Sequence, residues 1–242
     1  MTITRMLEIG PYPKFKLDEL PLGEREEADS VNFNLNSLHR WATNFWCAKA
    51  LFENCTNQRV LDANNGRIYE KWQLCAARDC VMAVYHFGKT IEGIDTSMGK
   101  CPTLRILTNS VLRSDTRRAF EKLFPSFIYL RHAISHSAER SHTMKASKKH
   151  GAVKTKTIQI SPNFAVNLGS EDSILLLHDN IFGTTFSSMW MGEIVRLELT
   201  SRTGEILDEI IEKLRRAFEP IINHEPEPLP TVTVSRHSSL QP

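Results

Sequence analysis

The segment Arg131-His132-Ala133-Ile134-Ser135-His136 places a permanently charged guanidinium close in sequence to two imidazoles. A guanidinium offers a rigid fork of donors that fits phosphate oxygens, and an imidazole gives or takes a proton near pH 7. These are the groups that general acid-base cleavage of RNA requires. Arginine and histidine are common residues, so the pair has little specificity by itself, and the surrounding sequence must decide whether it forms a site.

A stretch of uncompensated positive charge follows this segment. Between Arg140 and Thr157 there are six Lys or Arg residues, two histidines and no acidic residue. One interpretation is a solvated loop, and the other is a surface that follows the phosphates of a polyanion. Because the stretch comes directly after the Arg/His segment, we name four of its residues as candidate RNA-binding residues: Arg140, Lys145, Lys148 and Lys149.

A metal site is the weaker alternative for the same histidines. His132 and His136 are four residues apart, a spacing that lets two imidazoles on one helical face bind zinc. Ala133 stands where zinc proteases carry a glutamate between the two histidines. A zinc site needs further ligands, and only Glu139, His142 and His150 stand nearby in sequence as a possible third ligand. We therefore expect neither a metal nor another cofactor.

Asp79 is the acidic residue that we single out. It lies at the margin of an apolar helical stripe and has no basic residue four positions away. A carboxylate in such a position can pair with a cation across a helical bundle and shift the pKa of that cation. We therefore name Asp79 as a candidate orienting acid for Arg131 or a histidine, with simple surface exposure as the alternative.

Apolar residues at intervals of three and four predict the helices that carry these groups. The first such stripe covers residues 38–52, and the longest covers 67–94, where a second apolar row indicates contact with neighbours on two sides, as in a bundle. A shorter helix is predicted over 102–112. The helix with the Arg/His segment should begin near Ser114, a good N-cap, and should kink at Pro125, which lacks a backbone donor.

After the basic stretch the pattern changes from helical to alternating. Residues 155–160, 174–178, 184–189 and 195–199 are rich in β-branched and apolar residues, which predicts a small antiparallel sheet of three or four strands. Such a sheet is marginal alone, so its apolar face must lie against helices. A last helix is predicted from about Thr203, with acidic residues early and basic residues late, an order that complements the helix dipole.

The composition and the order of the predicted elements indicate one large, mainly α-helical domain. The chain has 242 residues, 41% of them hydrophobic, which is enough for a sizeable core. The predicted organisation is a lead-in (1–30), a single domain (31–222) and a disordered tail (223–242). Within the domain we expect a helical bundle (31–140), a basic loop (140–157), a β-hairpin region (153–200) and a C-terminal helix (203–219).

Several classes of protein are disfavoured by the same composition. No run approaches the roughly 18 uncharged apolar residues that a membrane span needs, and charges and prolines occupy the place of a signal peptide core. The expected compartment is therefore the cytoplasm. The net charge of +2 identifies no partner. The five cysteines form no C-x-x-C pair, and we expect them to be small buried hydrophobes.

A bundle whose late helix carries Arg131-His132 and then His136 resembles the HEPN superfamily, many of whose members carry Arg, four to six residues, and His. The surrounding Leu130 and Ala133-Ile134-Ser135-His136 are similar to that family's motif, although His132 stands where Asn is usual. The Trp72 and Tyr85-His86-Phe87 segments of the long helix, followed by a hairpin and a C-terminal helix, resemble the bacterial abortive-infection-type branch. The resemblance covers residues 30 to 220.

The resemblance implies a metal-independent RNA endonuclease of toxin or phage-defence type that acts as a homodimer. His136 would be the general acid or base in the attack of a ribose 2′-hydroxyl on phosphorus, which leaves a 2′,3′-cyclic phosphate. Arg131 would stabilise the charge that develops on the phosphorane oxygens, and His132 would orient phosphate or ribose. On an ideal helix Arg131 and His136 are about 140° apart, a separation that a second copy could compensate.

Members of this superfamily also include proteins that bind without cutting. The alternative function is therefore a non-catalytic dimerisation or binding module for a protein or nucleotide. The expected partners are RNA and a second copy of the chain, with an antitoxin or a nucleotidyltransferase as a further candidate. Nucleotidyl transfer by the chain itself is disfavoured, because it lacks the Gly-Ser and paired-acid pattern of such enzymes.

Overall fold

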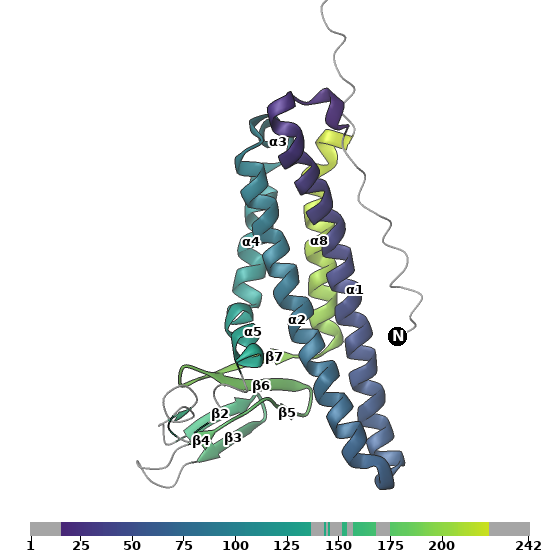
Figure 1. Ribbon diagram of the computed structural model, residues 1–242, viewed down its shortest axis with the longest axis vertical. Coiled ribbons are helices and arrows are strands. Elements are labelled where there is room, and N and C mark those ends of the chain that lie inside the picture. The colour runs from purple at the N-terminus through teal and green to yellow at the C-terminus, as the bar shows by residue number, and fades with distance from the viewer. Residues whose placement is uncertain are drawn as a thin grey trace, which may run out of the picture.

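The computed structural model describes residues 16–136, 143, 145, 152–153, 157–167 and 175–222. Its main body is a helical bundle in which α1 (Arg25–Leu61) and α2 (Gly66–Gly99) form a long hairpin, joined by the short η4 (Ala63–Asn65). The helices α4 (Ser110–Leu123) and α8 (Ser201–Ile222) run alongside this hairpin (Figure 1). A small β region lies beside the bundle at the end of α5 (Phe127–Ser135) (Figure 1). The chain is therefore mainly helical, as predicted.

The two apolar stripes that predict α1 and α2 form the centre of the core. Phe45 of α1 and Phe87 of α2 are fully buried, and Phe52 and Ile94 are 2% and 1% exposed. Burial of each such side chain stabilises the fold by roughly 1.5–3 kcal/mol. Most members of the two stripes are buried, whereas Ile68 and Trp72 near the start of α2 are 47% and 53% exposed.

The first helix is longer than predicted at both ends. It begins at Arg25, after the short η2 (Leu17–Glu19) and η3 (Leu22–Glu24), so the prediction of an irregular lead-in up to residue 30 was wrong for its last part. Ala28 and Val31 are fully buried. They extend the apolar stripe by two turns, and their burial favours helix in a segment that is otherwise rich in charge.

The segment predicted as one kinked helix is two helices. The helix α4 (Ser110–Leu123) ends before Pro125, and α5 (Phe127–Ser135) begins after it. Proline disfavours helical geometry in the residue before it and removes a donor, so the chain breaks instead of bending. The N-cap prediction at Ser114 was also wrong, because Asn109 caps α4 and its Oδ1 accepts a hydrogen bond from the Leu112 backbone N–H at 3.0 Å.

The helix α3, which precedes Asn109, is shorter than predicted. The helix α3 (Pro102–Leu107) ends three residues after Leu104, which is fully buried. The predicted range of 102–112 therefore spans the end of one helix and the start of the next. The side-chain oxygen of Asn109 accepts a hydrogen bond from a backbone N–H in the first turn of α4, so a new helix begins there.

Close contact between α2 and the α4–α5 pair depends on Gly88. A Cβ built on Gly88 would lie 2.6 Å from ring atoms of both Phe120 and Phe127. These two rings come from opposite sides of the break at Pro125. Gly88 therefore lets the end of α4 and the start of α5 lie against α2, which sets the position of α5.

Among the described residues, the β region contains three small antiparallel sheets. The largest contains β5 (Asn180–Phe182), β6 (Thr185–Trp190) and β7 (Glu193–Glu198), in that order. Its β6–β7 turn has positive φ at Met191 and Gly192, the geometry of a tight hairpin. The two-stranded sheets pair β2 (Thr157–Ser161) with β3 (Phe164–Asn167), and β1 (Ala152–Val153) with β4 (Leu175–Leu176).

The alternating pattern predicts an antiparallel sheet but only some of its strands. The strands β6 and β7 agree with the prediction, whereas the stretch predicted as 174–178 has strand structure only at Leu175–Leu176 among its described residues. The strand β6 is buried on both faces, because Phe186 joins the helical core while Met189 packs with Ile158 and Ile160 of β2. The expectation of a sheet with one apolar face, packed against helices, was therefore wrong for this central strand, which is buried on both faces.

Cys55, Cys80 and Cys101 are buried as expected, and burial raises the pKa of the Cys80 thiol to about 12. Cys47 and Cys75 are exposed, so the prediction was wrong for these two. They lie on the outer faces of α1 and α2.

In the described part of the chain no helix combines the length and apolar character that a membrane crossing requires. The tail predicted for 223–242 and most of the basic loop lie outside the described residues.

Candidate functional site

The last turn of α5 presents the Arg/His segment at the junction of the bundle and the sheet. Leu130 and Ala133 are buried and fasten this turn to the core. Arg131 and His132 lie between them in sequence and are half-buried, while His136 is the C-cap of the helix. The helix packs against α2 on one side and against β6 and β7 on the other. The segment is therefore held by three elements.

The two histidines share a face, as their spacing predicts, and both rings lie against Trp190. The His132 ring stacks on the indole with centroids 5.2 Å apart, and the His136 ring lies 5.7 Å from it. The two imidazoles are 6.0 Å apart. Trp190 is the last residue of β6 and precedes the tight β6–β7 turn. The hairpin thus covers one side of both rings.

The guanidinium of Arg131 contacts an imidazole and an aromatic ring. Its Nη1 lies 3.4 Å from Nδ1 of His132, and its Cζ lies 5.8 Å from the centre of the Tyr85 ring. A guanidinium can only donate, so Nδ1 of His132 is the acceptor and the ring proton resides on Nε2. Arg131 forms no ion pair with any carboxylate among the described residues.

A third histidine that we could not connect with the site from the sequence lies beside this group. His86 follows Tyr85 on α2, and their rings are 5.2 Å apart. Trp41 of α1 stacks on His86 with centroids 4.4 Å apart and an interplanar angle of 21°. In the sequence, the Tyr85-His86 pair on the long predicted helix was the one feature that could have pointed to His86. Tertiary packing, which the sequence pattern does not show, brings this pair next to Arg131. We call Tyr85, His86, Arg131, His132 and His136 the Arg131 cluster.

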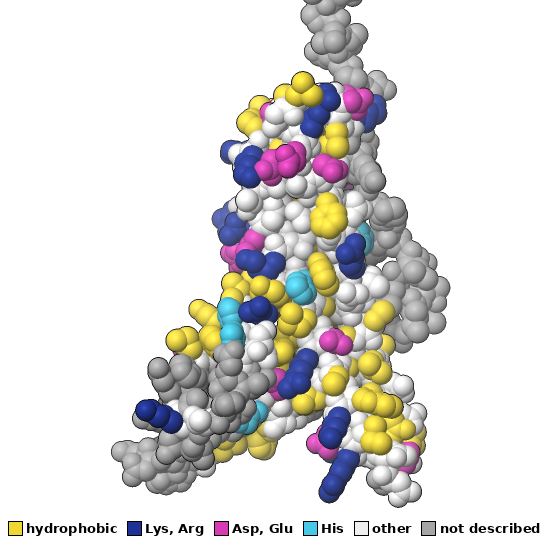
Figure 2. All heavy atoms as spheres, viewed as in Figure 1, with side chains coloured by type: hydrophobic (Ala, Val, Ile, Leu, Met, Phe, Trp, Pro, Cys, Tyr) yellow, Lys and Arg dark blue, Asp and Glu magenta, His cyan; other side chains and the backbone are white. Residues whose placement is uncertain are grey.

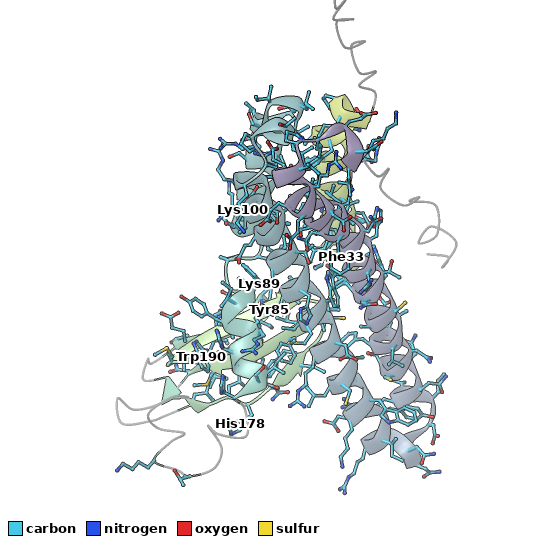
Figure 3. All side chains as sticks on the ribbon, turned by 45° about the horizontal axis from the view of Figure 1, so that its top comes forward. Phe33, Tyr85, Lys89, Lys100, His178 and Trp190 are labelled. Atoms are coloured by element: carbon cyan, nitrogen blue, oxygen red, sulfur yellow. The ribbon has the colours of Figure 1, made fainter. Side chains whose placement is uncertain are left out.

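Figure 3 shows Tyr85 and Trp190 near α5, one from α2 and one from the sheet. In the space-filling view, histidine side chains lie next to basic and hydrophobic side chains where α2 meets the β region (Figure 2). Each side chain of the Arg131 cluster is partly exposed to solvent.

Burial and like charge both favour neutral imidazoles in this cluster. Burial lowers the pKa of His132, and electrostatic interactions with Arg131 and His136 lower it further. The pKa of His86 is also lowered, first by burial and then by Arg131. Both rings are therefore neutral at pH 7, a state in which an imidazole both donates and accepts hydrogen bonds and can take a proton.

Asp79 does not serve as the predicted partner. Its side chain is exposed and makes no ion pair with Arg131 or with any other residue that the structure describes. The neighbouring Arg78 makes the ion pair instead, with 2.8 Å between its Nε and Oδ2 of Asp179. Asp179 also accepts a hydrogen bond at 2.6 Å from Ser188 of β6. The Arg78–Asp179 ion pair fastens the sheet to α2. Adjacent residues of a helix point about 100° apart, so Asp79 faces away when Arg78 faces the sheet.

The predicted RNA-binding residues are only partly described. Lys145 is exposed, and Arg140, Lys148 and Lys149 lie outside the described residues. The described part of the chain contains no group of three His, Cys, Asp or Glu side chains arranged to hold a metal ion. Three candidate third ligands for His132 and His136 lie outside the described residues: Glu139, His142 and His150.

The cluster can therefore bind an anion through Arg131, and the neutral imidazoles of His86 and His132 can accept a proton. Comparisons with protein family models, with curated proteins and with solved structures gave no match.

Proposed function

We propose that the protein is a metal-independent RNA endonuclease of toxin or phage-defence type, of HEPN-like fold, which acts in the cytoplasm as a homodimer. One observation carries the proposal. The guanidinium of Arg131 has no carboxylate partner among the described residues and lies in a cluster with three imidazoles. A phosphodiester would supply the missing negative charge.

The reaction that suits these groups is transfer of the phosphoryl group within the RNA strand. A neutral imidazole takes the proton of a ribose 2′-hydroxyl, and the oxygen attacks the adjacent phosphorus. The bond from phosphorus to the 5′-oxygen breaks, and that oxygen takes a proton. The products are a 2′,3′-cyclic phosphate and a 5′-hydroxyl end. We assign proton transfer to His136 and stabilisation of the phosphorane charge to Arg131.

His132 suits the orienting role. Its Nδ1 accepts from Arg131, so its Nε2–H is directed away from that contact and can donate to a phosphate or ribose oxygen. His86 offers a second neutral imidazole on the α2 side of the cluster. General acid-base cleavage needs one group to accept a proton and another to give one, and the cluster contains enough imidazoles for both.

Two copies of the chain would complete the site. Arg131 precedes His136 by five residues, and His136 already lies beyond the last helical residue, against Trp190. A two-fold dimer with the α5 ends facing each other would bring two guanidinium groups to one strand of RNA. The exposed Lys145 and the basic stretch that contains it would then follow the phosphates on either side. An antitoxin or a nucleotidyltransferase remains the further partner that we propose.

The test is cleavage of a defined single-stranded RNA by purified protein in excess EDTA, with the fragment ends identified by mass spectrometry. The proposal predicts 2′,3′-cyclic phosphate and 5′-hydroxyl ends, with a rate that EDTA does not change. Fragments with 3′-hydroxyl ends, or cleavage that requires added divalent metal, would contradict it.

A second candidate function is a non-catalytic binding module, and the position of Trp190 favours it. The indole lies against both His132 and His136 and covers one side of the rings. In this reading Arg131 binds an anionic partner and no bond is broken. Cleavage that is absent in the wild-type protein and also absent after Trp190→Ala would support this function, whereas cleavage in either protein would exclude it.

A further inference from the structure

A second group of arginines lies at the other end of the bundle, outside the Arg131 cluster. Here an open cavity of about 460 Å³ is lined by the C-terminal part of α2, by α3, and by one face of α4 from Arg113 to Glu121. In Figure 1 this end is away from the β region. We call it the arginine pocket. The charged residues that line it are Asp95, Arg105, Arg113, Arg117, Arg118 and Glu121.

The arginines of this pocket outnumber the carboxylates that neutralise them. Asp95 is shared, with its oxygens 3.5 Å from Nε of Arg113 and 3.3 Å from Nη1 of Arg117. Glu121 pairs with Arg117 at 2.8 Å. Arg105 is exposed and forms no ion pair with any described residue. Three guanidinium groups therefore meet two carboxylates, which leaves one positive charge in excess at the cavity.

Arg118 contributes to the wall but not to this excess. Its Nη2 lies 2.9 Å from Oδ1 of Asp115, a neighbour on the same helix. Exposed pairs of this kind contribute little to stability and are readily rearranged. Arg118 is therefore free to turn toward a ligand at small cost, whereas Arg113 is fixed.

Arg113 is held in place inside the pocket wall. Its side chain is 12% exposed, and its Nη1 donates a hydrogen bond at 3.0 Å to the hydroxyl of Thr108. The pKa of Arg113 is lowered by burial and by the nearby charge of Arg105, and Asp95 offsets this only in part. A guanidinium in this position gains from a further anion, because its one carboxylate is distant and shared.

We propose that the arginine pocket binds the phosphoryl groups of a small polyphosphate compound. Planar guanidinium groups fit phosphate oxygens in pairs, and the volume lies in the range of small-ligand sites. No aromatic side chain lines the cavity, so the described wall offers no platform for a base. Recognition therefore depends on the phosphate chain. This inference stands independently of the proposed ribonuclease function.

The experiment is isothermal titration calorimetry of the full chain with sodium tripolyphosphate in low-salt buffer, beside ATP, AMP and a short single-stranded RNA. Tripolyphosphate and ATP should bind with affinities within a few-fold of each other, and AMP more weakly. Arg105→Gln should weaken tripolyphosphate binding about tenfold, the effect of losing one charge-assisted contact. Its matched control is Arg40→Gln, an exposed arginine on α1 outside the pocket, which should change nothing.

Asp95→Asn separates a ligand site from an internal ion-pair network. Loss of the shared carboxylate leaves two arginines available, so an anion site should bind tripolyphosphate several-fold more tightly, in a variant whose circular dichroism matches wild type. Any one of four results would overturn the proposal: no tripolyphosphate binding, equal effects of Arg105→Gln and Arg40→Gln, unchanged or weaker binding in folded Asp95→Asn, or binding of RNA alone.

Discussion

The state of the His132 ring depends on the residue that covers it. Trp190 lies against the ring, and burial is the largest cause of its lowered pKa. We predict that Trp190→Ala raises the pKa of His132 toward its ordinary value of 6.5. The measurement is an NMR titration of the imidazole proton. Trp72→Ala, which removes an exposed indole elsewhere on α2, is the control and should leave the titration unchanged. An unaltered curve in Trp190→Ala would show that another group excludes water from the ring.

Neutral histidines also make the fold sensitive to acid. The pKa values of His39, His86 and His132 are all lowered in the folded protein, so the unfolded chain binds more protons as the pH falls through 6.5. The free energy of unfolding should therefore decrease from pH 7.5 to pH 5.5.

Thermal melts at the two pH values measure this decrease. His86→Gln should reduce it, because glutamine takes up no proton, whereas substitution of the exposed His178 by glutamine should not. Identical slopes in wild type and His86→Gln would contradict the assignment of His86 as a partly buried imidazole with a lowered pKa.

The sequence indicates which side chains of the site could do chemistry, but it identifies only some of the residues that meet there. Arg131, His132 and His136 are adjacent along the chain, and helical periodicity puts the two histidines on one face. Trp190 lies 54 positions beyond His136, and no local rule connects them. The choice of Asp79 failed for a related reason, since whether Asp79 or Arg78 faces the sheet depends on where β5 packs.

Among the elements, α5 depends on the close approach that Gly88 allows. Alanine at this position would bring its Cβ within 2.6 Å of Phe120 and Phe127. We predict that Gly88→Ala lowers the free energy of unfolding by about 1–3 kcal/mol, because overpacking outweighs the gain in helix propensity of about 1 kcal/mol. Urea denaturation is the measurement.

Gly99→Ala is the matched control for this substitution. It lies in the same helix, and a Cβ there would meet no atom within 4 Å. We expect Gly99→Ala to leave stability nearly unchanged. A neutral or stabilising effect of Gly88→Ala would mean that the phenylalanines move aside at little cost, and α5 would then be less firmly placed than the contacts indicate.

The helices were more predictable than the strands for a physical reason. The stripe from Leu38 to Phe52 repeats over several turns, so it indicates a helix whatever it packs against. The proline at position 125 marks a boundary, although the sequence does not distinguish a kink from a break. The strand β6 is buried on both faces, and its Ser187 and Ser188 are fully buried polar residues, so it lacks the alternation that identifies a half-exposed strand.

For the whole molecule, the proposed site requires two copies of the chain. If Arg131 of one copy acts with His136 of the other, mixing Arg131→Ala with His136→Ala protein creates dimers with one intact site. An equal mixture that exchanges freely should recover roughly a quarter of the wild-type specific activity, from half-active dimers that make up half of the population. The assay is RNA cleavage after mixing, with light scattering to establish the dimer.

Failure to recover activity in an exchanging mixture would mean that the two residues act within one copy or that all four are needed. A protein that is monomeric at assay concentration yet fully active would exclude the composite site. Either result leaves the arginine pocket untouched, because that cavity is formed within one chain.

The decisive measurement is the rate of RNA cleavage in EDTA for wild type, Arg131→Ala, His136→Ala and His178→Ala. We predict that each of the first two substitutions lowers the rate by roughly 100-fold or more, and that His178→Ala, a change at an exposed histidine outside the cluster, retains the wild-type rate. Wild-type rates in folded Arg131→Ala and His136→Ala proteins would contradict the assignment of this cluster as the site of cleavage.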